Sequence, residues 1–240
     1  HQRAVQDYDE ALRLDPQLAA AYSNRGNAYN ELGQRTRAIG DYDEALRLDP
    51  QLAVAYGGRG RANNELGRYA RAVRDFDEVI RLDPQGSAAY RGRGKAHTEL
   101  GQLELGLKDL SEAIRLDSQD AGSYAYRGKA YTELGQPEQA LEDLNEAISR
   151  DFTDARVYND RGVAFSALGQ HVRAIQDLDA AIRLDPQLAV AYGNRGRALS
   201  ELGEHAQAIL DYDEALRLDP QNALFHNNRG NAYSQMGQHQ

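Results

Sequence analysis

Apolar residues recur along this chain at the spacing of amphipathic helices. In residues 19–52, two stripes of Ala, Tyr, Ile and Leu, spaced by three or four positions, lie on either side of Gly33. A glycine at such a point commonly ends a helix in the left-handed conformation. The second stripe stops at Asp49-Pro50, because proline cannot continue the helical hydrogen bonds. The pattern predicts two helices joined by a short turn.

The same pattern returns every 34 residues over the whole chain. The string DYDEALRLDPQ begins at Asp7, Asp41 and Asp211, which are separated by one and by five such steps. Neither helix of a pair can bury its stripe alone, whereas stacked pairs can bury both. The repeat therefore predicts an all-α fold in which helix pairs stack into an α-solenoid.

The residues of one repeat carry a resemblance to a known family. Its motif reads Tyr22-x2-Arg25-Gly26-x2-Tyr29, then Ala38-x3-Tyr42, then Pro50. This resembles the tetratricopeptide repeat, whose pattern is W-x2-L-G-x2-Y, then A-x3-F, then P over 34 residues. The resemblance covers the whole chain and implies a right-handed superhelix of helix-turn-helix repeats. It also implies a single array over 1–240, with a half repeat at 1–18, full repeats at 19–52, 53–86, 87–120, 121–154, 155–188 and 189–222, and a half repeat at 223–240.

Two repeats depart from the pattern. In one, Gly106 replaces the usual alanine of the second helix, and in the next, Phe152 replaces the usual proline. We expect looser or altered packing around residues 104–122 and 149–156, because both changes fall at positions that pack or end a helix.

Charged residues also keep the 34-residue step. Every repeat places an arginine before the first-helix glycine, where the family pattern has leucine: Arg25, Arg59, Arg93, Arg127, Arg161, Arg195 and Arg229. An aspartate recurs on the second helix: Asp7, Asp41, Asp75, Asp109, Asp143, Asp177 and Asp211. Each arginine lies eight residues before the turn glycine and each aspartate eight after, so an antiparallel helix pair brings them to the same height.

We therefore predict an ordered ladder of structural Arg–Asp ion pairs. The sequence leaves open whether each arginine pairs with the aspartate of its own repeat or of the previous one. For Arg229, only Asp211 is available. A row of arginines that binds phosphate groups is the functional alternative.

The resemblance implies that the first helices line a concave groove, with the fifth, ninth and twelfth residues of each repeat facing it. Asn amides and cationic side chains there can hold an extended peptide. The candidate peptide-binding residues are Asn27, Asn30, Arg61, Asn64, Arg91, Lys95, Lys129, Asn159, Arg197 and Asn231. The stretch with Arg91, Lys95 and Lys129 is the most basic, so we expect an acidic side chain or a C-terminal carboxylate to dock there.

Composition narrows the function further. The 240 residues include 28 Lys+Arg against 37 Asp+Glu, a net charge of −9 that argues against nucleic-acid binding. The sequence has no cysteine, and its six histidines are scattered, with no metalloprotease, nucleophile-elbow or phosphate-loop motif. We expect no enzymatic activity, no catalytic residues, no cofactor and no metal.

No apolar run reaches the roughly 18 residues of a membrane span and no signal peptide opens the chain, so we expect a soluble protein without a membrane partner, cytoplasmic in preference to secreted.

Together these features predict a protein–protein interaction scaffold that binds a peptide or protein segment in its concave groove. Two alternatives remain open. The half repeats would expose complementary faces, and His1-Gln2 and His239-Gln240 occupy the same repeat position, which favours head-to-tail self-association into superhelical filaments. The other alternative is the binding arm of a larger enzyme.

Overall fold

The structure is a computed structural model that describes residues 1–238, with side chains described to residue 237. Within this part of the chain all regular structure is helical and no strand occurs, so the predicted all-α fold is confirmed. The chain forms two compact units, His1–Ser123 and Tyr124–Gln240. That both units belong to one continuous array stays a prediction, and the phase match of His239-Gln240 lies outside the described residues.

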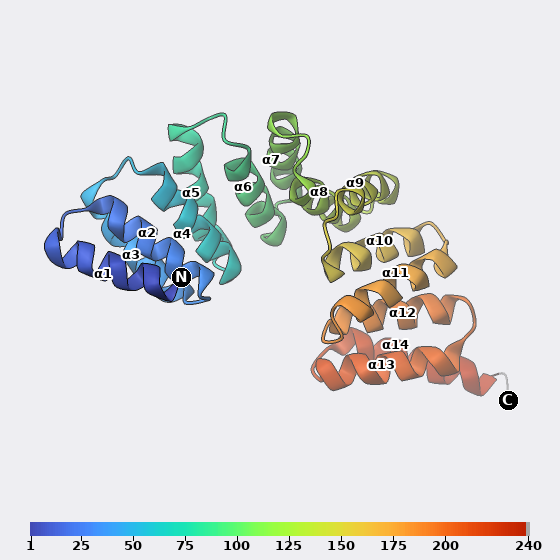
Figure 1. The fold of residues 1–240 in the computed structure, drawn as a ribbon. Helices are drawn as coiled ribbons and strands as arrows, with labels where there is room; N and C mark the ends of the chain where they lie inside the picture. Colours follow the sequence, from blue (N-terminus) through green and yellow to red (C-terminus); the bar gives the residue numbers. More distant parts are fainter. Residues whose placement is uncertain (239–240) are drawn as a thin grey trace. The chain divides into compact units, whose positions relative to one another are not determined.

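The first unit is a stack of antiparallel helix pairs (Figure 1). Helix α2 packs on α3, α4 on α5 and α6 on α7, and each pair packs on the next through neighbours such as α3 and α4. Helix α1 covers one side of α2. The bounds are α1 (Gln2–Leu14), α2 (Ala19–Glu31), α3 (Arg35–Leu48), α4 (Ala53–Glu65), α5 (Tyr69–Leu82), α6 (Ser87–Glu99) and α7 (Leu103–Leu116).

The second unit has the same construction, with α8 starting just before its boundary. Helix α10 packs on α11, α12 on α13, and α13 on the final helix α14. The bounds are α8 (Ala121–Glu133), α9 (Pro137–Ser149), α10 (Ala155–Ala167), α11 (His171–Leu184), α12 (Ala189–Glu201), α13 (His205–Leu218) and α14 (Ala223–Gln238).

The turn inside each helix pair depends on glycine. Six glycines that end first helices have φ between 69° and 80°, a left-handed backbone that strains any residue with a Cβ atom. Gly237 differs, because it lies inside α14, which continues to Gln238. The six are Gly33, Gly67, Gly101, Gly135, Gly169 and Gly203.

The core is a repeated layer of alanines and one large side chain per pair. In the α2/α3 pair, Ala38, Tyr42 and Ala45 are fully buried, and Tyr22 and Tyr29 pack against them. The helices approach closely because small residues face large ones. A Cβ atom on Gly26 would lie only 2.8 Å from Cε1 of the Tyr42 ring. The tyrosine series thus serves the packing between helices.

The two departures from the repeat pattern have different outcomes. Gly106 is buried, and the Thr98 hydroxyl occupies the space that a Cβ atom would need, so packing there is altered and not looser. After α9, Asp151 takes a left-handed φ of 58° and Phe152 packs onto the core cluster that includes Leu144. The side chain of Asp154 then caps α10 in place of the usual Asp-Pro turn.

Candidate functional site

The ladder arginines contact the aspartate of their own repeat. In six repeats the guanidinium group donates two hydrogen bonds to the aspartate sixteen residues later, at N···O distances of 2.6–3.0 Å. These aspartate side chains are only 5–10% exposed. The pairs are Arg25–Asp41, Arg59–Asp75, Arg93–Asp109, Arg127–Asp143, Arg161–Asp177 and Arg195–Asp211. In these six repeats, the arginine therefore pairs with the aspartate of its own repeat and not with that of the previous repeat.

A second, more exposed partner comes from the preceding helix. The Nη1 atom of Arg25 donates to Asp9, sixteen residues earlier, at 2.6 Å, and the tyrosine three residues before the arginine lies under its guanidinium group. The sequence analysis missed these partners, although the same 34-residue period runs through them. The other members are Asp43, Asp77, Asn145, Asp179 and Asp213.

Two members of the predicted ladder differ from the rest. Arg229 was expected to use Asp211, but it donates to Asp213 at 2.6 Å, because Asp211 is already held by Arg195. Asp7 is exposed, and Arg25 contacts Asp9 instead.

The ladder is built for structure and leaves little charge for a ligand. Arg25 lies between Asp41, Asp9 and the Tyr22 ring, and its side chain is 19% exposed. Arg59, Arg93 and Arg195 have the same three kinds of neighbour, and so has Arg161, with Asn145 in place of the second aspartate. Hydrogen bonding with Asp41 raises the pKa of Arg25 above its already high ordinary value. A phosphate group would have to displace the buried carboxylates, so the geometry disfavours the phosphate-binding alternative.

Asn64 and Thr98, at the twelfth position of the repeat, lie inside the fold instead of facing an open groove. Asn64 is buried, and its amide donates to the Gly92 carbonyl oxygen at 2.8 Å. Thr98 is buried against Gly106, and Asn30 is half-buried. These residues differ from the expectation of a ligand-facing row because short polar side chains also fit the narrow spaces between neighbouring helices.

The fifth position packs between neighbouring first helices. Asn159 is buried, accepts a hydrogen bond from Asn194 at 2.9 Å and donates one to Asp160 at 3.1 Å. Ser23 is buried as well. Arg91, at the same position, is half-buried and bonds Asp120 at 2.5 Å. Asn159 and Arg91 are thus engaged within the fold.

The ninth position remains the most open of the three. Arg61, Arg197 and Asn231 are exposed, whereas Lys95 is half-buried. Asn27 is half-buried and accepts a hydrogen bond from the Tyr42 hydroxyl at 2.8 Å.

The basic stretch expected to dock an acid is partly neutralised. Lys129 lies 3.6 Å from Glu133, one turn further along α8, and Arg91 has its partner in Asp120. Arg61 and Arg197, in contrast, make no ion pair among the described residues, since Glu65 pairs with Arg35 and no bond joins Arg197 to Glu201.

A polar network in the second unit was missed by the sequence analysis. Asp160, beside Asn159 in α10, is half-buried, and this burial raises its pKa to about 6, although Asn159 and Lys129 favour the charged form. Asp160 and Asn194 hold the sixth position of their repeats. Asn24 and Asn228 occupy the sixth position of two other repeats, so the 34-residue period could have identified this row of polar residues.

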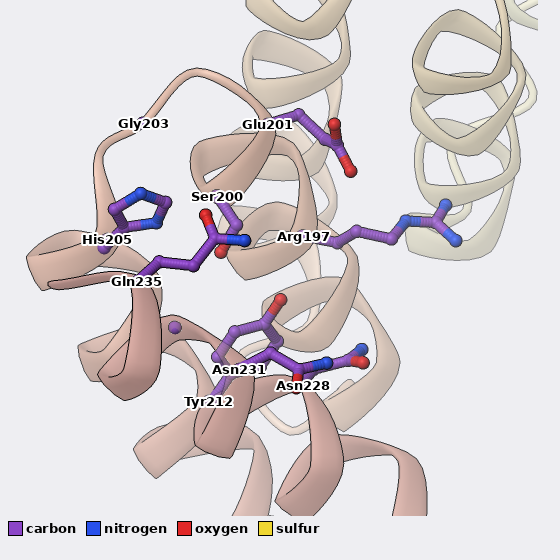
Figure 2. Close-up of a pocket in the computed structure, with 10 residues that line it drawn as sticks. Arg197, Ser200, Glu201, Gly203, His205, Tyr212, Asn228, Asn231 and Gln235 are labelled. Atoms are coloured by element: carbon purple, nitrogen blue, oxygen red, sulfur yellow. The ribbon is translucent and has the colours of Figure 1, made fainter. Parts of the chain in front are cut away.

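An open cavity of about 470 Å³ lies on α12, α13 and α14 of the second unit (Figure 2). It brings together Arg197 and Asn231, two of the predicted binding residues, and Figure 2 shows Arg197 extended away from the tyrosine ring. Burial raises the pKa of Tyr212 in its wall. The lining residues are Arg197, Ser200, Glu201, Gly203, His205, Tyr212, Asn228, Asn231, Ala232 and Gln235.

Neither a metal site nor a membrane span is found in the described part of the chain. No three His, Cys, Asp or Glu side chains in residues 1–237 gather in a group that could hold a metal ion. None of the helices described here combines the length and the apolar character that crossing a membrane requires.

Family models match this chain along most of its length. The models described as TPR repeat and Tetratricopeptide repeat match residues 1–33, 19–52, 58–121, 128–169, 155–188 and 196–237. The chain belongs to the tetratricopeptide repeat family. No curated protein sequence matches it.

Solved structures share the fold at low sequence identity. The chain is similar to the APC/C hetero-tetramer Cut9–Hcn1, with a TM-score of 0.86 and 17% identity over 96% of this chain, and it spans 45% of that chain. It is similar to PilF of Pseudomonas aeruginosa, with a TM-score of 0.73 and 18% identity over 94% of this chain and 99% of that one. YrrB, described as a TPR protein with an unusual peptide-binding site, has a TM-score of 0.59 and 25% identity over 77% of this chain and 95% of its own. The repeats and these relatives make the chain a protein-interaction scaffold in general terms.

Proposed function

We propose that this scaffold binds an extended peptide segment along the first helices of its second unit, with an acidic group of the peptide at Arg197. The observation that carries the proposal is the open cavity beside Arg197, where a cation and several amides line one surface. Such a surface suits a polypeptide, which offers both carboxylates and backbone hydrogen-bonding groups.

The choice of Arg197 follows from the state of the other cations. The ladder arginines are held by buried aspartates, and Arg91 and Lys129 each have an acidic neighbour. A ligand carboxylate at Arg197 displaces no ion pair within the described residues. This moves the expected acid-docking point from Arg91, Lys95 and Lys129 to the cavity on α12 and α14.

The amides of α14 supply the remaining contacts. Asn228, Asn231 and Gln235 lie three or four residues apart, so they share one side of the helix and line the same cavity. Each amide offers donors and an acceptor, which match the N–H and C=O groups of an extended backbone. The similarity to YrrB, a TPR protein with a peptide-binding site of its own, supports the same class of ligand.

The proposed role is binding without a catalytic step, a cofactor or a metal. The polar side chains that line the cavity are donors and acceptors for recognition: Arg197, Ser200, Glu201, His205, Tyr212, Asn228, Asn231 and Gln235.

Peptide selection tests the proposal directly. Peptides are selected from a phage-displayed random library on the full chain, and the best is synthesised and its Kd measured by fluorescence anisotropy. Arg197→Ala should weaken binding roughly tenfold or more, because a charge-assisted hydrogen bond contributes about 1.5–3 kcal/mol.

The matched control is Arg183→Ala, which removes an exposed arginine from α11, outside the cavity. Its Kd should equal that of the unaltered chain. An unchanged Kd in Arg197→Ala, or a loss confined to Arg61→Ala in the first unit, would refute the assignment to this cavity.

A further inference from the structure

In two repeats, an arginine of the second helix covers an aromatic ring of the first helix. The Cζ atom of Arg37 lies 5.7 Å from the centre of the Tyr29 ring, and that of Arg173 lies 4.3 Å from the centre of the Phe165 ring. A guanidinium group within about 6 Å of a ring centre is attracted to the face of the ring. At the eleventh position of these two repeats, the ring therefore fills the space beside its arginine.

The repeat over residues 53–86 keeps the arginine and lacks the ring. Arg71 holds the repeat position of Arg37, whereas Asn63 holds that of Tyr29. Both Arg71 and Asn63 line a cavity of about 260 Å³ in the first unit. The short amide therefore leaves open a space that an aromatic side chain occupies elsewhere in the chain.

Asn63 does not complete the packing by itself. It is only 3% exposed, and its Nδ2 atom donates to Asp75 at 3.0 Å. Its Oδ1 atom is buried without a hydrogen-bond partner among the described residues. A buried acceptor without a partner is unfavourable. Stability of the fold thus gives no reason for an amide at this position, whereas an open binding space does.

We propose that this cavity binds the aromatic side chain of an acidic peptide. The ring of the peptide lies against the guanidinium group of Arg71, as the Tyr29 ring lies against Arg37. A carboxylate of a neighbouring residue of the peptide pairs with Arg74 on the wall of the cavity.

The charge of the occupant follows from the ion pairs around the cavity. Its two acidic residues, Asp43 and Asp75, both accept hydrogen bonds from Arg59, at 2.6 Å in each case. Arg71 and Arg74 are exposed on α5 and make no ion pair among the described residues. The unbalanced charge of the cavity is therefore positive, which attracts an acidic peptide and repels a basic one.

Arg74 distinguishes this repeat from the two that contain the ring. The same position holds Gly40 in the repeat of Tyr29 and Gln176 in the repeat of Phe165. The repeat that lacks the ring thus carries an additional cation beside the open space, and this cation has no partner within the described fold.

The size and the wall of the cavity fit one ring. An apolar cavity of about 150 Å³ is enough to hold benzene, and this one has about 260 Å³. Ile39, which is half-buried on α3, contributes an apolar surface for the edge of the ring. The cavity lies within the first unit and shares no residue with the cavity at Arg197, so the inference goes beyond the proposed peptide site and does not depend on it.

A titration with short peptides tests the proposal. The full chain is titrated with the tripeptide acetyl-Glu-Tyr-Glu-amide, and binding is followed by NMR at the methyl signals of Ile39, which reports on this cavity. We expect saturable shifts of these signals. Acetyl-Glu-Leu-Glu-amide, which lacks the ring, should bind at least about fivefold more weakly. Acetyl-Lys-Tyr-Lys-amide, with the opposite charge, should cause no saturable shift.

Substitutions locate the site. Asn63→Tyr places in the cavity the residue that the first full repeat has there and should weaken binding by about tenfold or more, because the space is filled. Arg71→Ala should weaken it about fivefold and Arg74→Ala about threefold, because a cation against the ring and an exposed ion pair are lost. The control Arg183→Ala, exposed on α11, should bind like the unaltered chain.

Urea denaturation checks that the variants are folded. Asn63→Tyr should be at least as stable as the unaltered chain, since Tyr29 already packs in the core at this position. Arg71→Ala alters only an exposed side chain, so it keeps the test decisive if Asn63→Tyr fails to fold. Equal affinities for the tyrosine and leucine peptides, a folded Asn63→Tyr or Arg71→Ala variant that binds normally, or no saturable shift at Ile39 would each overturn the proposal.

Discussion

Helices α2 and α14 share the string NRGNAY, yet the structure treats the same residues differently. In α2, Arg25 is 19% exposed and holds Asp41, and Tyr29 packs into the core. In α14, Arg229 is 30% exposed and Tyr233 is 49% exposed. The two helices differ in their neighbours, because α3 lies on α2 and no described helix follows α14.

The comparison teaches that burial in this fold comes from the adjacent helix and not from the local sequence. A solenoid repeat contributes one face to each neighbour, so its stability is a sum of local and nearest-neighbour contributions. Changes to shared residues should therefore have large effects in α2 and small effects in α14.

The largest difference should come from the ladder aspartates. Asp41→Ala leaves Arg25 without its two buried hydrogen bonds and should lower the free energy of unfolding by about 3–5 kcal/mol. Asp213→Ala removes an exposed partner of Arg229 and should cost less than about 1 kcal/mol. Urea denaturation measures both losses of unfolding free energy, and equal losses would contradict the larger contribution of the buried aspartate.

A smaller effect on stability concerns Asp160, which is half-buried in the second unit. Its pKa is raised from 3.8 to about 6, mainly by burial, with Glu133 adding to the rise and Lys129 and Arg156 opposing it. Between about pH 4 and 6 the folded chain keeps a proton that the unfolded chain has lost, so stability falls as the pH rises through this window.

The substitution Asp160→Asn should remove this loss of stability, because an amide does not titrate in this pH range. The variant should match the unaltered chain near pH 4 and become more stable by roughly 2–3 kcal/mol above pH 6, if the Asn159 bond is kept. Thermal unfolding at the two pH values measures the difference. A stability difference that does not change with pH would show that Asp160 titrates normally.

The smallest effects on the free energy of unfolding should come from two glycine-to-alanine substitutions, and they should differ in sign. Gly26→Ala puts a methyl group against the Tyr42 ring and should cost about 1–2 kcal/mol, even after the gain in helix propensity. Gly230→Ala meets no atom within 4 Å and should stabilise α14 by up to about 1 kcal/mol. Both are measured by urea denaturation at low protein concentration, and a loss of stability in Gly230→Ala would contradict the open surface.

Much of the fold could be predicted because one period governs every level of it. The spacing of apolar residues defined the helices, and glycines such as Gly33 marked the turns. The ladder was also predicted, since Arg25 and Asp41 are equidistant from that glycine. The choice between Asp41 and Asp7 was not, because both lie at similar heights and only the side-chain directions separate them.

The ligand-facing residues were harder to predict. Asn64 and Asn159 have the polarity of surface residues, yet their amides satisfy the Gly92 carbonyl and Asn194 inside the stack. A short polar side chain fits equally at a groove and in a narrow helix contact, so sequence alone does not distinguish them. The exposure of Arg197, its lack of an ion pair among the described residues and the cavity beside it all depend on neighbours that only the structure supplies.

Hydrogen–deuterium exchange tests the central claim most directly, since it compares the amides of α2 and α14 in one molecule. At a concentration where the chain is monomeric, we predict that Ala223–Gln238 exchanges at least about tenfold faster than Ala19–Glu31, because α2 is covered by both α1 and α3, whereas α14 is covered mainly by α13. Equal protection of the two helices in the monomer would contradict the claim that each helix owes its burial to the next.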